Sequence, residues 1–271
     1  MRNIYAFANQ KGGVGKTTSC VNLAASLAKL NKKVLLVDLD PQGNATMGSG
    51  VDKNAVEYSA NELLLAQVKA SEAIIPQTPA GYDLIAGNSD LTAAEVILLK
   101  QGQQEHVLAK ALALVAKRYD FILLDCPPSL NMLTVNALAA AVGVVIAMQC
   151  EYFALEGLTD LLNTIQQLQS MNPQLQVFGL LRTLYDNRNR LASEVSNQLI
   201  EHFGNKVFQT IIPRNVRLAE APSYGLPVCL YDKNSRGASA YLALASEFLR
   251  RNQKQNESLV AKAPMVAATV E

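Results

Sequence analysis

A glycine-rich segment near the N-terminus holds the residues best suited to chemistry. Residues 9–18 read Asn-Gln-Lys-Gly-Gly-Val-Gly-Lys-Thr-Thr, between an apolar run and a run with helical spacing. Glycines let successive backbone N–H groups turn toward phosphate oxygens, and the N-terminus of the following helix adds partial positive charge. Lys16 would then reach the β- and γ-phosphates of a nucleotide, and the Thr17 hydroxyl would bind Mg²⁺. The segment therefore predicts a phosphate-binding loop.

The segment departs at one position from the general pattern G-x-x-x-x-G-K-[ST], because Gln10 stands where the first glycine would be. A glycine-rich turn that binds no ligand is the alternative interpretation. The Gly-Lys-Thr triplet at a strand-to-helix junction and two acidic strand ends elsewhere favour phosphate binding. The residues expected to touch the nucleotide in this loop are Lys11, Gly12, Gly13, Val14, Gly15, Lys16, Thr17 and Thr18.

Carboxylates end two further apolar runs. Residues 34–37 are followed by Asp38 and Asp40, and residues 121–124 are followed by Asp125. At the carboxyl edge of a parallel sheet these side chains would lie where ligands bind. Asp38 and Asp125 would then hold Mg²⁺ directly or through water. A helix-capping role is the alternative for each carboxylate, and the glycine loop makes it the weaker one.

Short apolar runs alternate with helical patterns through most of the 271 residues. Strands rich in Val, Ile and Leu that are separated by helices are typical of a parallel sheet covered on both faces. We therefore expect an α/β fold with a doubly wound, mainly parallel sheet, in one domain over residues 1–251, with a flexible tail over residues 252–271. Strands are predicted at 3–8, 33–37, 83–86, 121–124, 142–148, 177–181 and 207–212. Helices are predicted at 16–30, 61–67, from 91 onward, and at 103–117, 130–140, 155–169, 191–203 and 237–250.

Composition narrows the class of protein. The 24 Lys and Arg against 23 Asp and Glu, with 49% hydrophobic residues, fit a globular chain of low net charge. The four cysteines are widely spaced and only two histidines are present, so we expect buried free thiols rather than a metal site or cluster within the chain. No apolar run reaches the roughly 18 residues of a membrane span, and no signal peptide core is evident. We expect a soluble, cytoplasmic protein.

The phosphate loop and the two acidic segments together resemble the ParA/MinD family of dimerising ATPases, P-loop NTPases with a deviant Walker A loop. This loop carries an extra lysine near its start, and Lys11 stands there. Segments 38–44 and 125–129 are similar to two other boxes of the family. Segments 150–158 and 212–222 resemble the chromosomal ParA (Soj) branch in particular, and the resemblance covers residues 3–249.

The resemblance implies a role for each matching residue. Lys11 would cross a dimer interface to the phosphates of the partner's ATP, and Gly12 would let the two subunits approach closely. Asp40 would position or activate the attacking water, so the implied catalytic residues are Lys11, Lys16 and Asp40. The remaining implied contacts are Thr17, Asp38 and Asp125 with Mg²⁺, and Pro213 and Asn215 with the adenine.

Basic residues are enriched in one part of the chain. Residues 182–251 contain ten Lys and Arg and six Asp and Glu. From charge alone, a solvated surface is the better interpretation. The resemblance instead implies ATP-dependent, sequence-independent DNA binding, because a dimer doubles the number of phosphate contacts. The expected DNA contacts are Arg188, Arg214, Arg217 and Arg236.

The resemblance also implies partners: an ATP-dependent homodimer, DNA of the nucleoid, and a ParB-like centromere-binding protein that stimulates hydrolysis. Chromosome or plasmid segregation would be the function. A MinD-like membrane-associated ATPase is the main alternative, but residues 252–261 lack the basic and bulky apolar faces of a membrane-bound helix. A cluster-bearing reductase or a metabolite kinase is a further alternative. Glu151 would either contact the partner subunit or cap a helix.

Overall fold

The computed structural model describes residues 3–152 and 154–261, which form a seven-stranded sheet in the order β3-β4-β2-β5-β1-β6-β7. Neighbouring strands are parallel, except for the antiparallel pair of β3 and β4 at one edge. The strands are β1 (Ile4–Phe7), β2 (Val34–Asp38), β3 (Ile74–Ile75), β4 (Asp83–Ile85), β5 (Phe121–Asp125), β6 (Gly143–Gln149) and β7 (Gln176–Thr183). The prediction of a doubly wound, mainly parallel sheet is confirmed.

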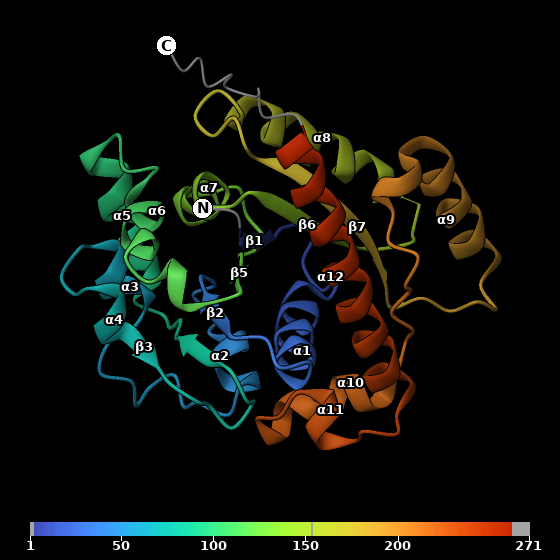
Figure 1. The fold of residues 1–271 in the computed structure, drawn as a ribbon, viewed down its shortest axis with the longest axis horizontal. Helices are drawn as coiled ribbons and strands as arrows, with labels where there is room; N and C mark the ends of the chain where they lie inside the picture. The colour runs from blue at the N-terminus through green and yellow to red at the C-terminus, as the bar shows by residue number, and fades with distance from the viewer. Residues whose placement is uncertain (1–2, 153, 262–271) are drawn as a thin grey trace, which may run out of the picture.

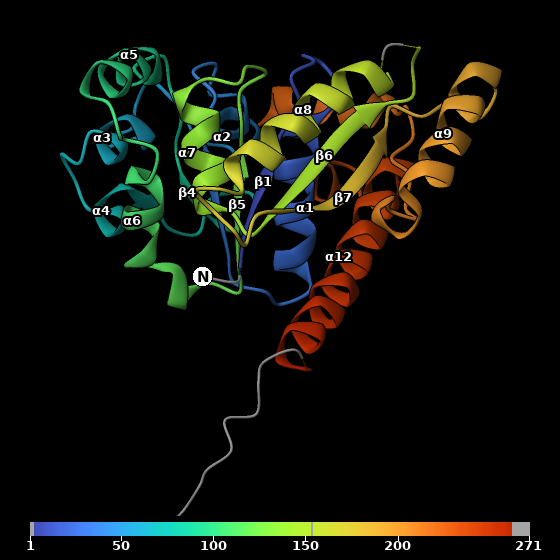
Figure 2. The same ribbon diagram turned by 90° about the horizontal axis from the view of Figure 1, so that it is seen from above.

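Helices cover both faces of this sheet, with α1 and α12 side by side on one face and α7 and α8 on the other (Figures 1 and 2). The longer helices are α1 (Lys16–Lys29), α5 (Leu91–Gln101), α6 (Val107–Ala113), α7 (Met132–Ala140), α8 (Ala154–Leu168), α9 (Arg190–Phe203) and α12 (Arg236–Ala261). The short ones are α2 (Asn44–Gly48), α3 (Ala60–Leu64), α4 (Ala70–Ala73), α10 (Val216–Glu220) and α11 (Val228–Tyr231), with 3₁₀ turns η1 (Ala116–Arg118), η2 (Gly204–Lys206) and η3 (Ala221–Tyr224). Among the described residues, no helix is long and apolar enough to cross a membrane.

Alternation along the buried strands divides the core into two layers. In β1, Ile4 and Ala6 belong to the apolar cluster shared with α7 and α8, whereas Tyr5 and Phe7 belong to the cluster shared with α1 and α12. Successive strand side chains point to opposite faces, so each strand contributes to both layers. All four cysteines are buried and free, as expected.

The segment predicted as a strand at 207–212 does not form a regular strand. It lies along the outer edge of β7 through isolated bridges between Leu180 and Val207 and between Tyr185 and Pro213. In between, the backbone N–H groups of Gln209 and Thr210 donate to the carboxylate of Glu247 on α12, at 2.9 and 2.8 Å. A side chain on a helix thus satisfies two backbone donors of this segment.

The other departures concern helix ends. The helix predicted at 103–117 is the shorter α6 followed by η1, and α12 continues to Ala261 rather than ending near residue 250. Residues 252–261, assigned to the flexible tail, are therefore helical. The Asn252 amide donates to the Tyr5 hydroxyl, which ties this extension to β1. Residues 262–271 lie outside the described residues, and their flexibility stays a prediction.

Candidate active site

The glycine loop connects β1 to α1 at the carboxyl edge of the sheet, as predicted. Gly13 and Gly15 have φ angles of +73° and +84°, a backbone conformation that residues with a Cβ rarely adopt. The Val14 carbonyl accepts a hydrogen bond of 2.6 Å from the Thr183 hydroxyl at the end of β7. The loop is therefore shaped by its glycines and held by the far side of the sheet.

Lys16 lies inside this loop and is only 6% exposed. Its ammonium donates to the Lys11 carbonyl at 3.2 Å, so its side chain folds back over the loop. Burial lowers the pKa of Lys16, and the nearby Asp125 and Asp40 oppose that change. The position suits a cation that neutralises phosphate oxygens.

The three predicted carboxylates meet beneath the loop. Asp38 and Asp125 are register partners on β2 and β5, and Asp125 is also the register partner of Phe7 on β1. Asp38 accepts hydrogen bonds from the backbone and hydroxyl of Thr46, each 2.8 Å, and from the Asp40 amide at 3.1 Å. Burial nevertheless raises the pKa of Asp38 to about 6.

Asp125 is less well satisfied than Asp38. It is fully buried, and neither of its carboxylate oxygens has a hydrogen-bond partner among the described residues. Burial raises the pKa of Asp125 well above its usual value, and the repulsion of Asp38 adds to this effect. The Thr17 hydroxyl opposes the increase in this pKa, although no hydrogen bond of standard geometry joins the two side chains.

These oxygens fit a hydrated Mg²⁺ ion. A buried carboxylate without a partner is stabilised by a cation, and Mg²⁺ prefers oxygen ligands, several of them water. Asp125 has both oxygens available, whereas those of Asp38 already accept three hydrogen bonds. No group of three or more Asp, Glu, His or Cys within the described part of the chain could hold a metal by itself. The ion would therefore need the Thr17 hydroxyl and phosphate oxygens as well.

A cavity of about 650 Å³ opens above the loop, a volume that suits a small-molecule ligand. Its lining includes nine of the site residues expected from the sequence, of which Arg214 was expected at DNA: Gly12, Gly13, Gly15, Lys16, Thr17, Thr18, Asp40, Arg214 and Asn215. Pro213, expected against the adenine, is not among them, although Ile212 and Asn215 are. The buried Oδ1 atom of Asn215 has no partner among the described residues, so it is an available acceptor for an amino group.

Several cavity residues escaped the sequence analysis. Thr183 and Leu184 follow the predicted end of their strand, and Tyr241 comes from α12. A hydroxyl at the carboxyl end of a buried strand was an available signal for Thr183. Tyr241 carried no such signal, because its place depends on the packing of α12 against α1, where its hydroxyl meets Ser19 at 3.1 Å.

Lys11 points away from the cavity. Its ammonium forms an ion pair of 2.5 Å with Glu151, just beyond the end of β6, and the two side chains are 48% and 43% exposed. The carboxylate of Glu151 thus engages Lys11 of its own chain, which neither of the two roles considered from the sequence included. The lysine expected to cross a dimer interface is held at the rim of its own site.

The four arginines expected to bind DNA are exposed and come from neighbouring segments. Arg188 lies in the loop after β7, which is joined to the Arg214 segment by a hydrogen bond from the Arg214 amide to the Tyr185 carbonyl. Arg217 lies on α10, and Arg236 begins α12, whose Gly237 packs against Leu218 of α10.

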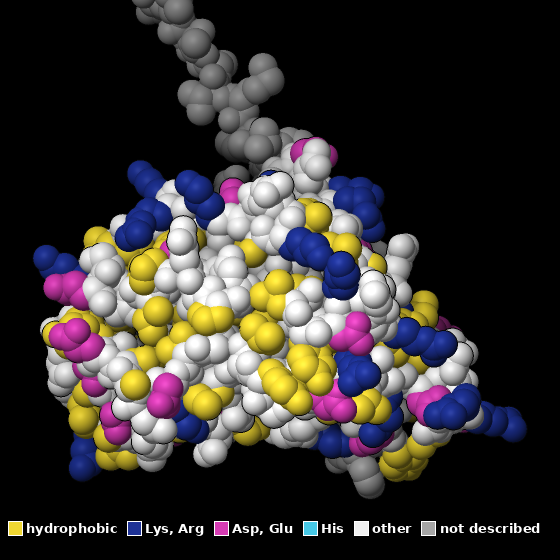
Figure 3. Space-filling view, turned by 90° about the horizontal axis from the view of Figure 1, so that it is seen from below, with side chains coloured by type: hydrophobic (Ala, Val, Ile, Leu, Met, Phe, Trp, Pro, Cys, Tyr) yellow, Lys and Arg dark blue, Asp and Glu magenta, His cyan; other side chains and the backbone are white. Residues whose placement is uncertain are grey.

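Two of these arginines already have carboxylate partners. Arg188 pairs with Asp186 at 2.7 Å, and Arg217 pairs with Glu220 at 2.8 Å and Asp232 at 3.3 Å. Figure 3 shows Lys and Arg mixed with Asp and Glu on the face that it displays. The arginine cluster is therefore a local patch rather than part of a basic coat.

Comparisons with known proteins agree on one family. A family model described as an AAA domain matches residues 2–177. An uncharacterised protein of Pseudomonas putida is 56% identical over 95% of this chain and 98% of its own length. The sporulation initiation inhibitor protein Soj of Bacillus subtilis is 49% identical over 91% of this chain and 98% of its own length.

A solved structure shares the same architecture. Cobyrinic acid a,c-diamide synthase from Mycobacterium smegmatis, crystallised with an ATP analogue and magnesium, superposes with a TM-score of 0.82 at 37% identity. The match covers 94% of this chain and 97% of that one. The loop, the paired strand-end carboxylates and these similarities together show that the chain belongs to the ParA/Soj family of P-loop ATPases, in which relatives from Myxococcus xanthus and Treponema pallidum, 46% and 50% identical to this chain, are named as chromosome-partitioning proteins.

Proposed function

We propose that this protein is a partitioning ATPase that binds Mg·ATP, dimerises on it, binds DNA without sequence preference as the dimer and is released when a partner protein stimulates hydrolysis. Its cargo would be a chromosome or a plasmid, and the protein would associate with the nucleoid. The observation that carries the proposal is the pairing of a complete phosphate site with an additional lysine at its rim. Lys16 and Asp125 lie inside the site, whereas Lys11 faces outward at 48% side-chain exposure.

Within one subunit, the chain's own residues suit the binding of a nucleoside triphosphate. The loop amides and Lys16 would neutralise phosphate oxygens, and Asn215 would accept from the amino group of the base. Mg²⁺, held through Thr17, Asp125 and phosphate, would supply charge neutralisation. Asp40 lines the cavity and is 8% exposed, so it can orient a water close to the terminal phosphate.

Dimerisation would follow from the position of Lys11. A cation at the rim completes a second subunit's phosphate site more effectively than its own, because Lys16 already occupies the interior. Only the triphosphate then has a γ-phosphate for Lys11 to contact, so ATP and ADP would differ in how strongly they favour the dimer. Such a difference is what a ligand-driven switch requires.

The similarity to Soj favours partitioning over the other interpretations. Soj of Bacillus subtilis is 49% identical to this chain, whereas the Mycobacterium synthase is 37% identical. A MinD-like membrane function remains the main alternative. The two functions differ in whether the protein binds DNA or a membrane. Both alternatives predict a nucleotide site, so ATP binding alone does not distinguish them.

Co-sedimentation with random-sequence DNA and, in parallel, with anionic liposomes tests the proposal, in ATP, ADP or no nucleotide. We expect DNA binding only with ATP, falling steeply with salt, and no liposome binding. Light scattering should show an ATP-dependent dimer. Binding to liposomes and not to DNA would favour the MinD-like function.

Three variants test the roles proposed for Lys16, Lys11 and Asp40. Lys16→Ala should lose nucleotide binding, because the interior cation is removed. Lys11→Ala should bind nucleotide but fail to dimerise or hydrolyse, and Asp40→Ala should dimerise on ATP without turnover. Rapid hydrolysis by Asp40→Ala would refute the role given to Asp40.

A further inference from the structure

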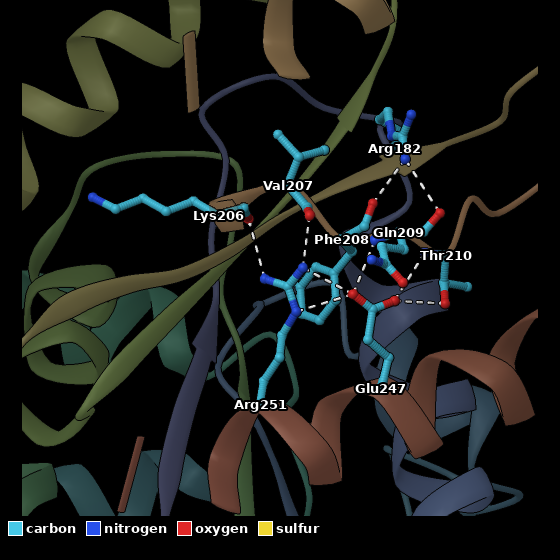
Figure 4. Close-up of polar contacts among 8 residues, drawn as sticks. All are labelled: Arg182, Lys206, Val207, Phe208, Gln209, Thr210, Glu247 and Arg251. Carbon is cyan, nitrogen blue, oxygen red and sulfur yellow. Dashed lines mark hydrogen bonds and ion pairs between the residues drawn. The ribbon is translucent and has the colours of Figure 1, made fainter. Parts of the chain in front are cut away.

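A second large cavity lies outside the nucleotide site and shares no lining residue with it. Its volume is about 610 Å³, and it is bounded by the start of β7, by η2 and the segment that follows it, and by the second half of α12. Figure 4 shows the polar contacts that shape this region. Neither the phosphate loop nor the arginines of the proposed DNA surface contribute to it.

The charges that line this cavity are strongly unbalanced. Five cations face a single carboxylate, Glu247; these cations are Arg182, Lys206, Arg250, Arg251 and Lys254. Lys206, Arg250 and Lys254 are exposed, and none of the three forms an ion pair with another described residue. A concave, cationic site of this kind concentrates anions.

The one carboxylate cannot balance these charges because its oxygens are already engaged. Glu247 accepts from the backbone of Gln209 and Thr210 and from the Thr210 hydroxyl, and it pairs with Arg251 at 2.8 Å. Arg251 in turn donates to the Val207 carbonyl at 2.6 Å and lies over the Phe208 ring (Figure 4). Glu247 and Arg251 therefore pair with each other in the wall of the cavity, and the other four cations form no ion pair with any described residue.

Arg182 gives an independent indication of a ligand. It is only 5% exposed, and its guanidinium donates to neutral acceptors alone: the Ser196 hydroxyl at 2.8 Å and the carbonyls of Phe208 and Gln209. Its Nε atom is buried with no partner among the described residues. A buried charge without a counterion is costly, and an anion in the adjoining cavity would reduce that cost.

We propose that this cavity is a second anion site, separate from the nucleotide site, which binds a phosphate group between Arg182, Lys206, Arg250 and Lys254. Guanidinium and ammonium donors in this number match the charge and the several acceptor oxygens of phosphate. The phosphate belongs either to a small phosphorylated molecule or to a nucleic-acid backbone. The site does not depend on ATP-driven dimerisation or on the proposed DNA surface.

Titration of the full chain with inorganic phosphate, followed by the chemical shifts of backbone amides, tests the proposal. The nucleotide site is first saturated with Mg·ADP. We expect saturable shifts for residues 204–210 and 250–254, and at least tenfold weaker binding in the double variant Arg250→Glu/Lys254→Glu. The control Lys100→Glu/Lys117→Glu makes the same change of charge at exposed positions on and near α5 and α6, and should bind as the wild type does.

A second titration, with a short DNA duplex, distinguishes the two sources. Competition between duplex and phosphate for the same amides would identify the backbone of DNA. Saturation by phosphate with no effect of the duplex would identify a small phosphorylated molecule. Shifts confined to the phosphate loop, or equal affinity in the wild type and Arg250→Glu/Lys254→Glu, would overturn the proposal.

Discussion

Asp125 shows how a functional site departs from what stability alone would select. It is completely buried and its two oxygens have no hydrogen-bond partner within the described residues, and Asp38 lies beside it in the register of the sheet. Two carboxylates in this position destabilise the empty site, because each must be desolvated next to a like charge. Mg²⁺ and nucleotide would relieve that cost, so ligand binding and folding stability are coupled here.

We expect the nucleotide-free protein in EDTA to become more stable as the pH falls from 8 toward 5. Burial raises the pKa of Asp38 to about 6, and that of Asp125 is raised as well, so the folded state takes up protons before the unfolded chain does. Protonation removes the buried charge, and the gain is lost as the pH rises through these folded-state values. For Asp38 the pKa difference from an unfolded value of ~3.9 corresponds to about 3 kcal/mol over the whole titration, of which about half is gained between pH 8 and pH 5.

Urea denaturation at a series of pH values measures this effect. Asp125→Asn should make the pH dependence shallower, because one of the two titrating groups is gone. Asp160→Asn, at an exposed position on α8, is the matched control and should keep the wild-type slope. A stability that rises with pH equally in all three proteins would contradict the coupling.

The ion pair between Lys11 and Glu151 makes a second prediction for a single residue. Both side chains are nearly half exposed, so the pair is worth at most about 1 kcal/mol. Glu151→Gln should free Lys11 in both subunits and strengthen ATP-dependent dimerisation by up to about thirtyfold, at about fivefold per pair, with nucleotide affinity unchanged. Sedimentation of the dimer at several protein concentrations measures this.

Glu201→Gln, an exposed substitution on α9, is the control for the loss of one negative charge. Weaker dimerisation of Glu151→Gln would mean that Glu151 contributes across the interface instead.

Among the elements, the segment after η2 depends on a helix rather than on the sheet it borders. Glu247 on α12 satisfies the backbone donors of Gln209 and Thr210, while Phe208 and Ile212 donate to carbonyls of β7. The segment then leads directly into Pro213–Asn215 at the nucleotide cavity. One carboxylate on α12 thus positions a wall of a site several residues away.

Glu247→Ala should therefore cost about 2–4 kcal/mol of folding stability. It leaves two backbone donors and one hydroxyl unsatisfied and removes the partner of Arg251. Nucleotide affinity should fall too, because the part of the cavity wall formed by Ile212, Arg214 and Asn215 loses its support. Denaturation curves and nucleotide titration measure the two effects.

Ser246→Ala changes the neighbouring, half-buried position on α12 and should remain within about 0.5 kcal/mol of the wild type. An equally small loss of folding stability in Glu247→Ala would show that the segment after η2 is held by its contacts with β7.

On the scale of the whole molecule, a net charge of +1 means that the proposed DNA binding would depend on a local concentration of arginines. Arg188 and Arg217 are paired with carboxylates in the monomer, whereas Arg214 and Arg236 form no ion pair with any other described residue. One subunit then offers few free phosphate contacts, and a dimer doubles them. This arrangement explains how a nearly neutral chain could bind DNA only after dimerisation.

Arg188→Glu should weaken DNA binding at least tenfold and reduce the dependence of affinity on salt. Its side chain is 87% exposed and its one polar partner among the described residues is Asp186 in its own loop, so the fold should be unaffected. Loss of one contact per subunit lowers the salt slope of the dimer by about 2. Lys100→Glu on α5, far from α9 in Figure 1, is the control of equal charge. Wild-type binding by Arg188→Glu would exclude this loop from the DNA surface.

The sequence by itself determined the class of fold and the interior of the phosphate site. Gly13 and Gly15 allow the positive φ angles of the loop, and apolar runs that end in Asp38 and Asp125 dictate where the carboxylates emerge from the sheet. These features are local, since each depends on a residue and its neighbours along the chain. The long periodic helices were predictable for the same reason.

Only the tertiary structure decided which distant residues meet. Lys11 and Glu151 are 140 positions apart, and Thr183 reaches Val14 across 169 positions. The same is true of Glu247, which accepts from the backbone of Gln209 and Thr210, and of Asn252, which contacts Tyr5. Polar groups find partners through the order of the strands and the packing of helices, and a local pattern of residue types contains neither.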